Sequence, residues 1–439
     1  MRSVWPLLVI CLLAGLIPWA CVDPIDQTLR ATNNLLVVDG TITNLAEPQT
    51  IKLNRSLADP KTGRFSTLPV IKAKVEIVVD SSRIIVCHET IDGTYQLPSD
   101  FKGEVGHAYQ LRFTLSDETS YVSDHQIMQP VPPITKVSAK FNPLSLPANQ
   151  LNGYRVGHDI MLETQDPANQ HNYYRWEWKL YEQQYWCRSC TQGVYSIYKV
   201  LTGVYKDRDY FVTGNELYED CFAPPAGMER YDAPEVPKNY WIYDYACRSA
   251  CWHIFYSYNI LTFDDQFSNG GLIHQGSIGQ IPFYDYQPGL VDVRQLSLTA
   301  DAYRYYKLFQ DQTEKTGGLA DTPPSALGGN VHQVANANSL VVGYFTASAV
   351  SVVHYWLDRK DYQGIAYGAM DTSGPHTQTG EDLFFAINQR RLTLEPPPPY
   401  QGGRDVPYVR LWPNENRPPT APCLLKDGQT PFKPEGWKD

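Results

Sequence analysis

Short segments in which apolar and polar residues alternate constrain the fold of this chain more than any other feature of its sequence. In residues 174–180 a large apolar side chain stands at every second position, with a charged one at each position between. A similar alternation runs through residues 109–115 and 74–79, and turn residues such as Asp92-Gly93 and Asp166-Pro167 separate such segments. Because successive side chains of a strand point to opposite faces, the pattern predicts strands with one buried and one solvent-exposed face.

These segments predict a fold that is mostly β, with an immunoglobulin-like sandwich followed by a second, larger β-sandwich domain. The first sandwich is expected over residues 33–130, where a proline-rich boundary, Pro130-Val131-Pro132-Pro133, begins. The second β-rich domain is expected over residues 134–412, with an aromatic, disulfide-stapled insertion at about 181–275. Residues 413–439 are expected to form a proline-rich C-terminal tail.

One or two helices are expected in the second domain. Apolar residues at helical spacing follow Thr299, which is a suitable N-cap, and Gly317-Gly318 ends the segment. A further apolar run, Val341–Val353, is predicted to form strands of the sandwich core. The chain also holds 30 Tyr and 33 Pro residues, and this composition agrees with a fold of strands and turns better than with a helical one.

The first twenty residues have the pattern of a signal peptide. Arg2 supplies a positive charge, and Ala20 is a small residue at the expected cut. The apolar run Val4–Ile17 between them is too short for an anchor helix, which needs about 20 apolar residues to span a bilayer. We therefore expect residues 1–20 to be removed on export.

Cys21 stands where lipoprotein processing attaches the lipid, although Pro18 occupies a position where leucine is usual. We expect lipidation on Cys21, a tether over residues 21–32, and a protein held at a membrane by its N-terminus. The alternative is a secretory signal without lipid, followed by an unrelated cysteine. The formal net charge of −10 argues against a nucleic-acid partner, which calls for a basic surface.

The cysteines fit an exported protein, in which clustered cysteines are more often disulfides than metal ligands. Cys87 follows an apolar, strand-like run and is predicted to be a buried free thiol. The candidates for disulfides are Cys187, Cys190, Cys221, Cys247, Cys251 and Cys423. The sequence leaves their pairing open.

The run Trp186-Cys187-Arg188-Ser189-Cys190 is similar to the redox site of thioredoxin-like proteins. Such a site needs a helix after the first cysteine, whereas residues 191–200 have a β pattern, so a structural disulfide is favoured. A zinc site built from Cys187, Cys190, Cys247 and Cys251 is a second alternative, and export disfavours it. We therefore predict no metal and no cofactor.

No set of residues in the sequence indicates catalysis. The chain lacks a His-Glu-x-x-His run, a Gly-x-Ser-x-Gly elbow, a Walker loop and a dinucleotide fingerprint. Gly328-Gly329-Asn330 is predicted to be a turn, since no Lys-Ser/Thr pair follows it. Because a glycosidase pair of carboxylates is defined by its separation in space, the sequence does not identify one. We predict that the protein is not an enzyme.

Aromatic residues of the insertion are the remaining functional feature. Tyr and Trp are enriched at protein interfaces, so these residues are predicted to form a platform for a ligand or a protein partner. An equally open alternative is a small core around the disulfides. The candidate binding face consists of Tyr185, Trp186, Tyr195, Tyr198, Tyr240, Trp241, Tyr243, Tyr245 and Trp252.

Short motifs spread over most of the chain carry a resemblance to a known family. They are Cys21-Val22-Asp23-Pro24-Ile25-Asp26, Val37-Val38-Asp39-Gly40, Gly93-Thr94-Tyr95 with Gly106 and Tyr109, Val131-Pro132-Pro133-Ile134, Tyr173-Tyr174-Arg175-Trp176, Ala302-Tyr303, Gly329-Asn330 and Gly343-Tyr344-Phe345. On these motifs the chain resembles a family of Bacteroidota lipoproteins grouped as domain of unknown function forty-two forty-nine.

The resemblance implies an outer-membrane lipoprotein that faces the cell exterior and is commonly encoded beside a TonB-dependent receptor. It implies capture of a small ligand, a glycan or a peptide, or capping of the receptor barrel, and no catalytic residues. A secreted hydrolase of glycan or peptide and a structural subunit of an envelope assembly are the alternatives. A cleft lined by two close carboxylates would favour the hydrolase, and a flat aromatic face would favour a partner surface.

Overall fold

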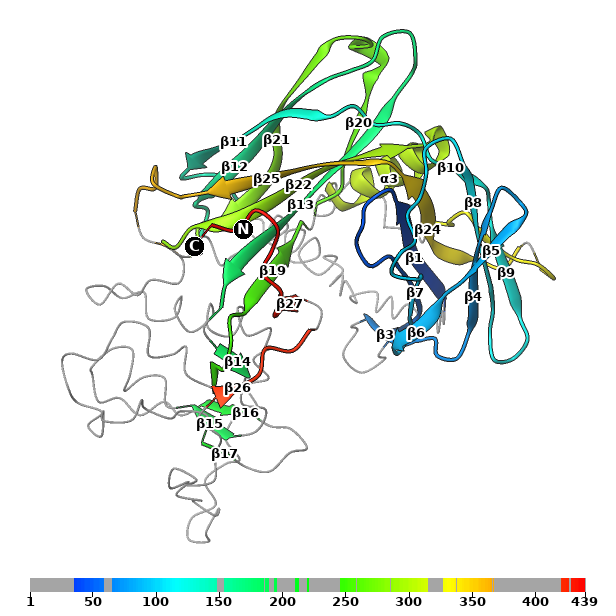
Figure 1. The fold of residues 1–439 in the computed structure, drawn as a ribbon, viewed down its shortest axis with the longest axis horizontal. Helices are drawn as coiled ribbons and strands as arrows, with labels where there is room; N and C mark the ends of the chain where they lie inside the picture. The colour runs from blue at the N-terminus through cyan, green and yellow to red at the C-terminus, as the bar shows by residue number, and fades with distance from the viewer. Residues whose placement is uncertain are drawn as a thin grey trace, which may run out of the picture.

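The computed structural model describes residues 35–58, 65–147, 154–184, 186–188, 193–195, 210–212, 219–220, 245–257, 259–284, 286–314, 327–336, 338–364, 366, 420–425 and 428–438. The signal peptide, Cys21 and the tether expected over residues 21–32 lie outside this part of the chain. Within it the fold is mostly β, as the alternating segments predicted, and the strands form several sheets (Figure 1).

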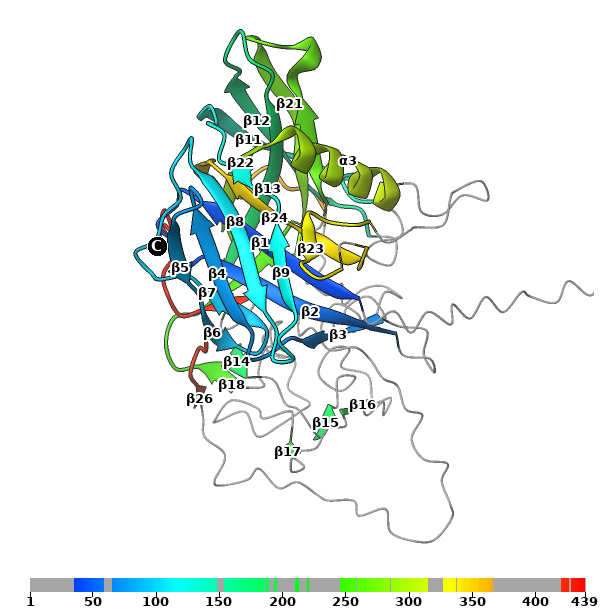
Figure 2. The same cartoon turned by 90° about the vertical axis from the view of Figure 1, so that its right-hand side faces the viewer.

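Two sheets enclose one apolar core and form what we call the first β unit. One sheet has the order β24 (Val341–Ser348), β1 (Leu36–Thr43), β2 (Thr50–Ala58), β7 (Thr94–Gln96), β6 (His88–Ile91), with β3 (Phe65–Pro69) beside β2. The other has the order β23 (Val331–Gln333), β9 (Ser120–Ser123), β8 (Ala108–Thr114), β4 (Lys74–Val79), β5 (Arg83–Val86), with β10 (Gln126–Ile127) on β8. Figure 2 shows β5, β4, β8 and β9 as a layer in front of β7, β1 and β2.

The apolar positions of the alternating segments face each other between these two sheets. Val38, Ile51, Leu53, Ile77, Leu111 and Phe345 are all fully buried there. Burying a side chain of this size stabilises a fold by roughly 1.5 to 3 kcal/mol. Cys87 belongs to the same core and carries a free thiol, as its strand-like surroundings predicted.

Strands from far along the chain complete the first β unit, which is therefore not confined to residues 33–130. β24 pairs in parallel with β1 over its whole length, from Leu36 opposite Val341 to Thr43 opposite Ser348. Gly343 permits the close approach: its φ is +92°, and a Cβ there would lie 1.9 Å from the carbonyl oxygen of Val38. Alternation along β1 shows which of its faces is buried, but it does not show which strand lies beside it.

The motif Gly329-Asn330 lies directly against the motif Gly343-Tyr344-Phe345. The buried side chain of Asn330 donates from Nδ2 to the carbonyl oxygen of Phe345 and accepts from the Phe345 amide at Oδ1, both at 2.9 Å. A Cβ at Gly329 would lie 1.7 Å from the carbonyl oxygen of Gly343. These residues hold the edge of β24 in place, so their role in the structure is packing of the backbone.

The second β unit also consists of two sheets around one core. One has the order β11 (Ile134–Asn142), β12 (Gly157–Gln165), β21 (Leu272–Pro282). The other, which we call the central sheet, has the order β25 (Val350–Leu357), β22 (Gly289–Leu298), β13 (Tyr173–Gln183), β19 (Trp252–Tyr256), β27 (Gln429–Thr430), with β20 (Leu261–Asp264) beside β13. Between the sheets lie Ile160, Leu162, Trp176, Trp178, Val291 and Val293.

The apolar run Val341–Val353 forms strands, as predicted, but its two halves belong to different units. β24 lies in the first unit and β25 in the central sheet of the second. The chain crosses between them at Ala349, whose amide donates to Ser297 Oγ at 3.0 Å and whose carbonyl accepts from the Ser297 amide at 3.0 Å. This crossing joins the two units through continuous backbone.

Helix α3 (Ala300–Glu314) follows β22 directly. The hydroxyl of Thr299 accepts a hydrogen bond from the Ala302 amide at 3.2 Å, which confirms the predicted N-cap. Ala302 and Tyr306 of the helix pack with Leu298 and Tyr344 in a small apolar cluster. In the part of the chain that the structure describes, no helix has the length and apolar character needed to cross a membrane.

The predicted insertion is narrower than residues 181–275. β13 continues to Gln183 in the central sheet, and β19 rejoins that sheet at Trp252. Between them lie β14 (Trp186–Arg188), β15 (Gly193–Tyr195), β16 (Tyr210–Val212), β17 (Glu219–Asp220) and β18 (Tyr245–Cys247). The C-terminal tail adds β26 (Thr420–Ala421) beside β18 and β27 beside β19.

Candidate functional site

Two disulfides lie at the base of the insertion, and one of them joins it to the C-terminal tail. Cys187 is bonded to Cys247, and Cys251 is bonded to Cys423. The candidates Cys190 and Cys221 lie outside the described residues. Since the partner of Cys187 is Cys247, the Trp-Cys-x-x-Cys run is not a redox disulfide of the thioredoxin kind.

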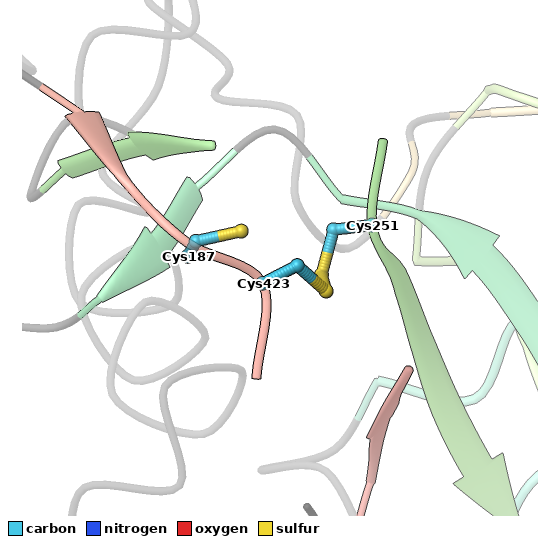
Figure 3. Close-up of side chains that lie close together, drawn as sticks. All are labelled: Cys187, Cys251 and Cys423. Atoms are coloured by element: carbon cyan, nitrogen blue, oxygen red, sulfur yellow. A yellow bond between two sulfur atoms is a disulfide. The ribbon is translucent and has the colours of Figure 1, made fainter. Parts of the chain in front are cut away.

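Sulfur atoms from both disulfides converge on one buried point. The Sγ atoms of Cys187, Cys251 and Cys423 all lie within 4.8 Å of one another (Figure 3). The side-chain amide of Gln429 lies 2.9 Å from Cys251 Sγ and 3.5 Å from Cys423 Sγ. Sulfur held in a disulfide is no thiolate ligand, so this cluster acts as a covalent clamp. The two disulfides close loops of 60 and 172 residues. By the loss of entropy of the unfolded chain, each stabilises the folded state by about 4 to 5 kcal/mol.

Trp252 is a core residue and not part of an exposed aromatic face. It is only 5% exposed, and its ring packs edge-on against Trp437, which in turn packs against Trp356. This agrees with the alternative of a small core beside the disulfides. Of the other predicted members, Trp186, Tyr195 and Tyr245 lie in strands whose side chains are not described. The remaining ones, Tyr185, Tyr198, Tyr240, Trp241 and Tyr243, lie outside the described residues.

The face of the central sheet that points away from the core of the second β unit carries a cluster of charged side chains. We call it the charged face and treat it as the candidate site. It consists of Arg175, Glu177 and Lys179 of β13, Asp292 and Arg294 of β22, His354 of β25, and Glu47 from the turn between β1 and β2. Alternation in β13 predicted a solvent-exposed face here. The structure instead buries every residue of β22, because the first β unit and α3 lie against this side of the sheet.

Arg294 lies at the centre of the charged face and joins the two β units. Its Nη1 and Nη2 donate to Oε1 and Oε2 of Glu47 at 2.6 and 2.8 Å, and Nη2 also donates to Asp292 at 3.1 Å. Burial opposes the guanidinium charge, but the hydrogen bonds and charge of Glu47 outweigh it and hold the pKa of Arg294 above its ordinary value. Burial likewise opposes the charge of Glu47, and Arg294 nevertheless holds the pKa of that carboxyl below its ordinary value.

A row of side chains crosses the charged face in strict register. His354 of β25 stands opposite Asp292, Asp292 opposite Lys179, and Lys179 opposite Tyr256 of β19. The Nδ1 atom of His354 contacts the Asp292 carboxylate directly. Asp292 is thereby shared between the imidazole of His354 and the guanidinium of Arg294.

Lys179 differs from the other cations of this face. Arg294 is paired with Glu47, and Arg175 donates to Glu177 at 3.0 Å while its guanidinium lies 4.7 Å from the ring centre of Tyr306. Lys179 Nζ lies 6.0 Å from the ring centre of Tyr256 and forms no ion pair with a carboxylate of the described residues. Burial and then the charge of Arg294 lower its pKa.

A family model described as Domain of unknown function (DUF4249) matches residues 22–352. The chain belongs to this family. The match covers both β units up to the first residues of β25 and includes Lys179, Asp292 and Arg294, while His354 and the C-terminal residues Cys423 and Gln429 lie beyond it. No curated protein and no solved structure matches the chain.

The sequence patterns predict that the charged residues of this site lie in strands, but they do not predict that another unit covers them. The alternation around Lys179 and the run Val291-Asp292-Val293-Arg294 both predicted strands correctly. One signal could have indicated a covered face. Charged residues of β13 and β22 that stand opposite each other carry unlike charges, and unlike charges across a sheet attract. Glu47 carried no such signal, because it belongs to a turn of the first unit.

Proposed function

We propose that this DUF4249 protein is a lipid-anchored outer-membrane protein, without catalytic activity, that captures a ligand for a TonB-dependent transporter or caps its barrel. The signal-peptide pattern and Cys21 support the anchor. The setting beside a transporter is what the resemblance of the sequence motifs implies. The exterior-facing location belongs to the same proposal.

The observation that carries ligand capture is the ammonium of Lys179, which lies beside Tyr256 and forms no ion pair with a carboxylate of the described residues. Removing a charge from water is costly unless an opposite charge accompanies it. The nearby carboxylates of Glu47, Glu177 and Asp292 are engaged by Arg294, Arg175 and His354. A ligand that brings its own carboxylate, such as an acidic glycan or an acidic peptide, would supply the missing partner, and Tyr256 would offer an aromatic surface beside it.

The experiment measures binding of acidic oligosaccharides and acidic peptides to the mature lipoprotein in detergent by calorimetry. Replacing Lys179 with Met should weaken binding of the acidic probe by about tenfold or more, as expected for removing one partner of a buried charge pair. A neutral oligosaccharide should show no such dependence. Lys136→Met is the matched control, because Lys136 is 61% exposed and paired with Glu163. Equal affinity of K179M and the native protein would refute this ligand face.

Transporter partnership is tested separately, by co-purification of the native lipoprotein in detergent. The double variant Trp186→Ala with Trp241→Ala keeps every cysteine in place and tests the aromatic face of the insertion. Weaker co-purification with unchanged thermal unfolding supports a binding role for these rings, since buried Tyr and Trp contacts are common hot spots. Lower stability with unchanged co-purification assigns them to a core, like Trp252.

Among the described residues the fold brings the carboxylates of Asp166 and Asp265 together, but this pair does not support the hydrolase alternative. Asp166 and Asp265 lie close enough for the Asn172 side-chain amide to contact both, at 3.3 and 3.1 Å. They are only 2% and 0% exposed, whereas a hydrolytic pair has to meet its substrate. Their arrangement points to a different role.

A further inference from the structure

Two turns meet at one end of the second β unit, and both carry acidic residues. The first turn connects β12 to β13 and includes Asp166 and His171. The second begins at Asp264, the last residue of β20, and includes the short helix η2 (Asp265–Phe267). The amide of Gly270 donates to Asp166 Oδ2 at 2.9 Å. This contact and others between the turns hold them side by side, although about a hundred residues separate them along the chain.

An imidazole and two carboxylates converge at this junction. His171 Nε2 lies 2.6 Å from Asp264 Oδ1 and 3.5 Å from Asp265 Oδ1, and the three ligand atoms lie within 4.8 Å of one another. The side chain of Asp265 is fully buried, whereas that of His171 is 47% exposed. The cluster is therefore buried at Asp265 and open to solvent at His171.

In the described residues, one oxygen atom of the buried Asp265 carboxylate has no hydrogen-bond donor. Asp265 Oδ2 accepts from the amide and the side chain of Asn172 at 2.9 and 3.1 Å, but Oδ1 accepts no hydrogen bond in the described part of the chain. Oδ1 faces His171 Nε2, which is already engaged at a shorter distance by Asp264. Buried acceptors of this kind are rare in folded proteins, and an ion is one of the explanations for them.

Among the described residues, the carboxylates around this oxygen outnumber the cationic groups that contact them. Asp166 accepts from the Tyr174 hydroxyl at 2.5 Å and from the Gly270 amide at 2.9 Å, which are both neutral donors. In the part of the chain that the structure describes, the ion pairs of Asp264 and Asp265 both involve the single imidazole of His171, so a cation at this place would relieve the repulsion among the carboxylates.

We propose that His171 Nε2, Asp264 Oδ1 and Asp265 Oδ1 bind a divalent transition-metal cation, Zn²⁺ or Mn²⁺. Imidazole favours metals of this type, and carboxylates complete such sites, whereas Ca²⁺ takes a larger set of oxygen ligands. Water fills the remaining positions on the open side.

The surroundings of His171 and Asp265 suit metal ligands. The other ring nitrogen of His171, Nδ1, lies 3.4 Å from the Tyr173 hydroxyl, and a ligating histidine usually has a polar partner at its second nitrogen. Asn172 orients Asp265 through two hydrogen bonds. The ring of Tyr173 also stacks on Tyr303 of α3, so the metal would fasten both turns beside the helix.

The experiment titrates chelator-treated mature protein in detergent with Zn²⁺, Mn²⁺ and Ca²⁺ by calorimetry. The native protein should bind Zn²⁺ or Mn²⁺ more tightly than Ca²⁺, and His171→Ala and Asp265→Asn should weaken binding by roughly tenfold or more. His107→Ala is the matched control, because exposed His107 also contacts two carboxylates, those of Asp80 and Glu104. It should bind metal like the native protein.

Thermal unfolding distinguishes a variant that has lost the metal site from one that fails to fold. Without metal, Asp265→Asn should unfold at the native temperature or above it, because the variant keeps an oxygen for Asn172 and loses the repulsion from Asp166. Added metal should raise the unfolding temperature of the native protein and not that of the variant. Absence of binding to the native protein at millimolar metal, or equal affinity in all variants, would overturn the proposal and leave a hydrogen-bonded clamp.

Discussion

Arg294 of the second β unit and Glu47 of the first form a double hydrogen-bonded ion pair, with N–O distances of 2.6 and 2.8 Å. The pair lies where the charged face of the central sheet meets the turn between β1 and β2. Arg294 is 8% exposed and Glu47 is 32% exposed as side chains. This bidentate contact gives direction as well as attraction to the packing of one unit on the other.

Arg294→Met should destabilise the protein by about 2 to 4 kcal/mol, because it leaves Glu47 and Asp292 partly or fully buried without their cation. Chemical unfolding of the mature protein measures the free energy. Arg304→Met is the control: Arg304 and its partner Asp301 are 72% and 73% exposed, so its loss should change stability by no more than about 0.5 kcal/mol. Equal effects of the two substitutions would contradict a structural role for the pair.

The stability of the protein should fall in acid in a way that depends on Glu47. Its folded-state pKa lies below the ordinary value of 4.5, so the folded state binds fewer protons there than the unfolded state. The stabilisation is complete above about pH 4.5 and is lost as the pH falls through the folded-state pKa. Unfolding free energies measured from pH 7 down to pH 3 should decline less steeply in Glu47→Gln than in the native protein. Identical slopes would refute this linkage.

Asn330→Ala should destabilise the first β unit, because it removes both hydrogen bonds to the backbone of Phe345 and leaves buried groups unsatisfied. At about 1 kcal/mol for each bond, and more for an unpaired buried group, the expected loss is roughly 2 to 4 kcal/mol. Asn336→Ala is the exposed control, since Asn336 accepts one local hydrogen bond from Asn338. Thermal or chemical unfolding measures the stability of both variants. If Asn330→Ala loses less stability than Asn336→Ala, β24 does not depend on Asn330.

The native protein should show no reactive thiol, and the protein unfolded without reductant should show at most one. Cys87 is 6% exposed, and burial, followed by the charge of Glu76, raises its pKa to about 12, so little nucleophilic thiolate forms at neutral pH. Thiol titration before and after unfolding makes the measurement, and Cys87→Ala should abolish the remaining signal. Three or more thiols after unfolding would contradict the disulfide framework.

Cys21→Ser should release the protein from the membrane fraction into the soluble fraction of the cell. Lipid on Cys21 is the anchor that the sequence predicts, and hydrophobic burial of the acyl chains supplies the membrane affinity. Fractionation after a high-salt wash makes the measurement, with Cys87→Ser as a cysteine control that should stay with the membranes. If the Cys21 variant still sediments with membranes, another element holds the protein there.

The sequence alone determined which segments become strands and which of their faces enters a core. Trp176 and Trp178 lie in the core between sheets because apolar residues at every second position share one face of a strand. The burial of Cys87 and the helix start at Thr299 followed from equally local patterns. Such patterns depend on neighbours along the chain, so one sequence is sufficient to recognise them.

Which strand lies beside each strand, and what covers the face turned away from its core, became clear from the folded chain. β24 pairs with β1 across about three hundred residues. Glu47 of the first unit and Tyr306 of α3 contact Arg294 and Arg175 on the charged face, and His171 meets Asp265 only because two turns fold together. Alternation in a strand predicts polar residues away from its own core, whether water or another unit covers them. Pairing and covering depend on the free energy of contacts between distant segments, and no local pattern records which segments these are.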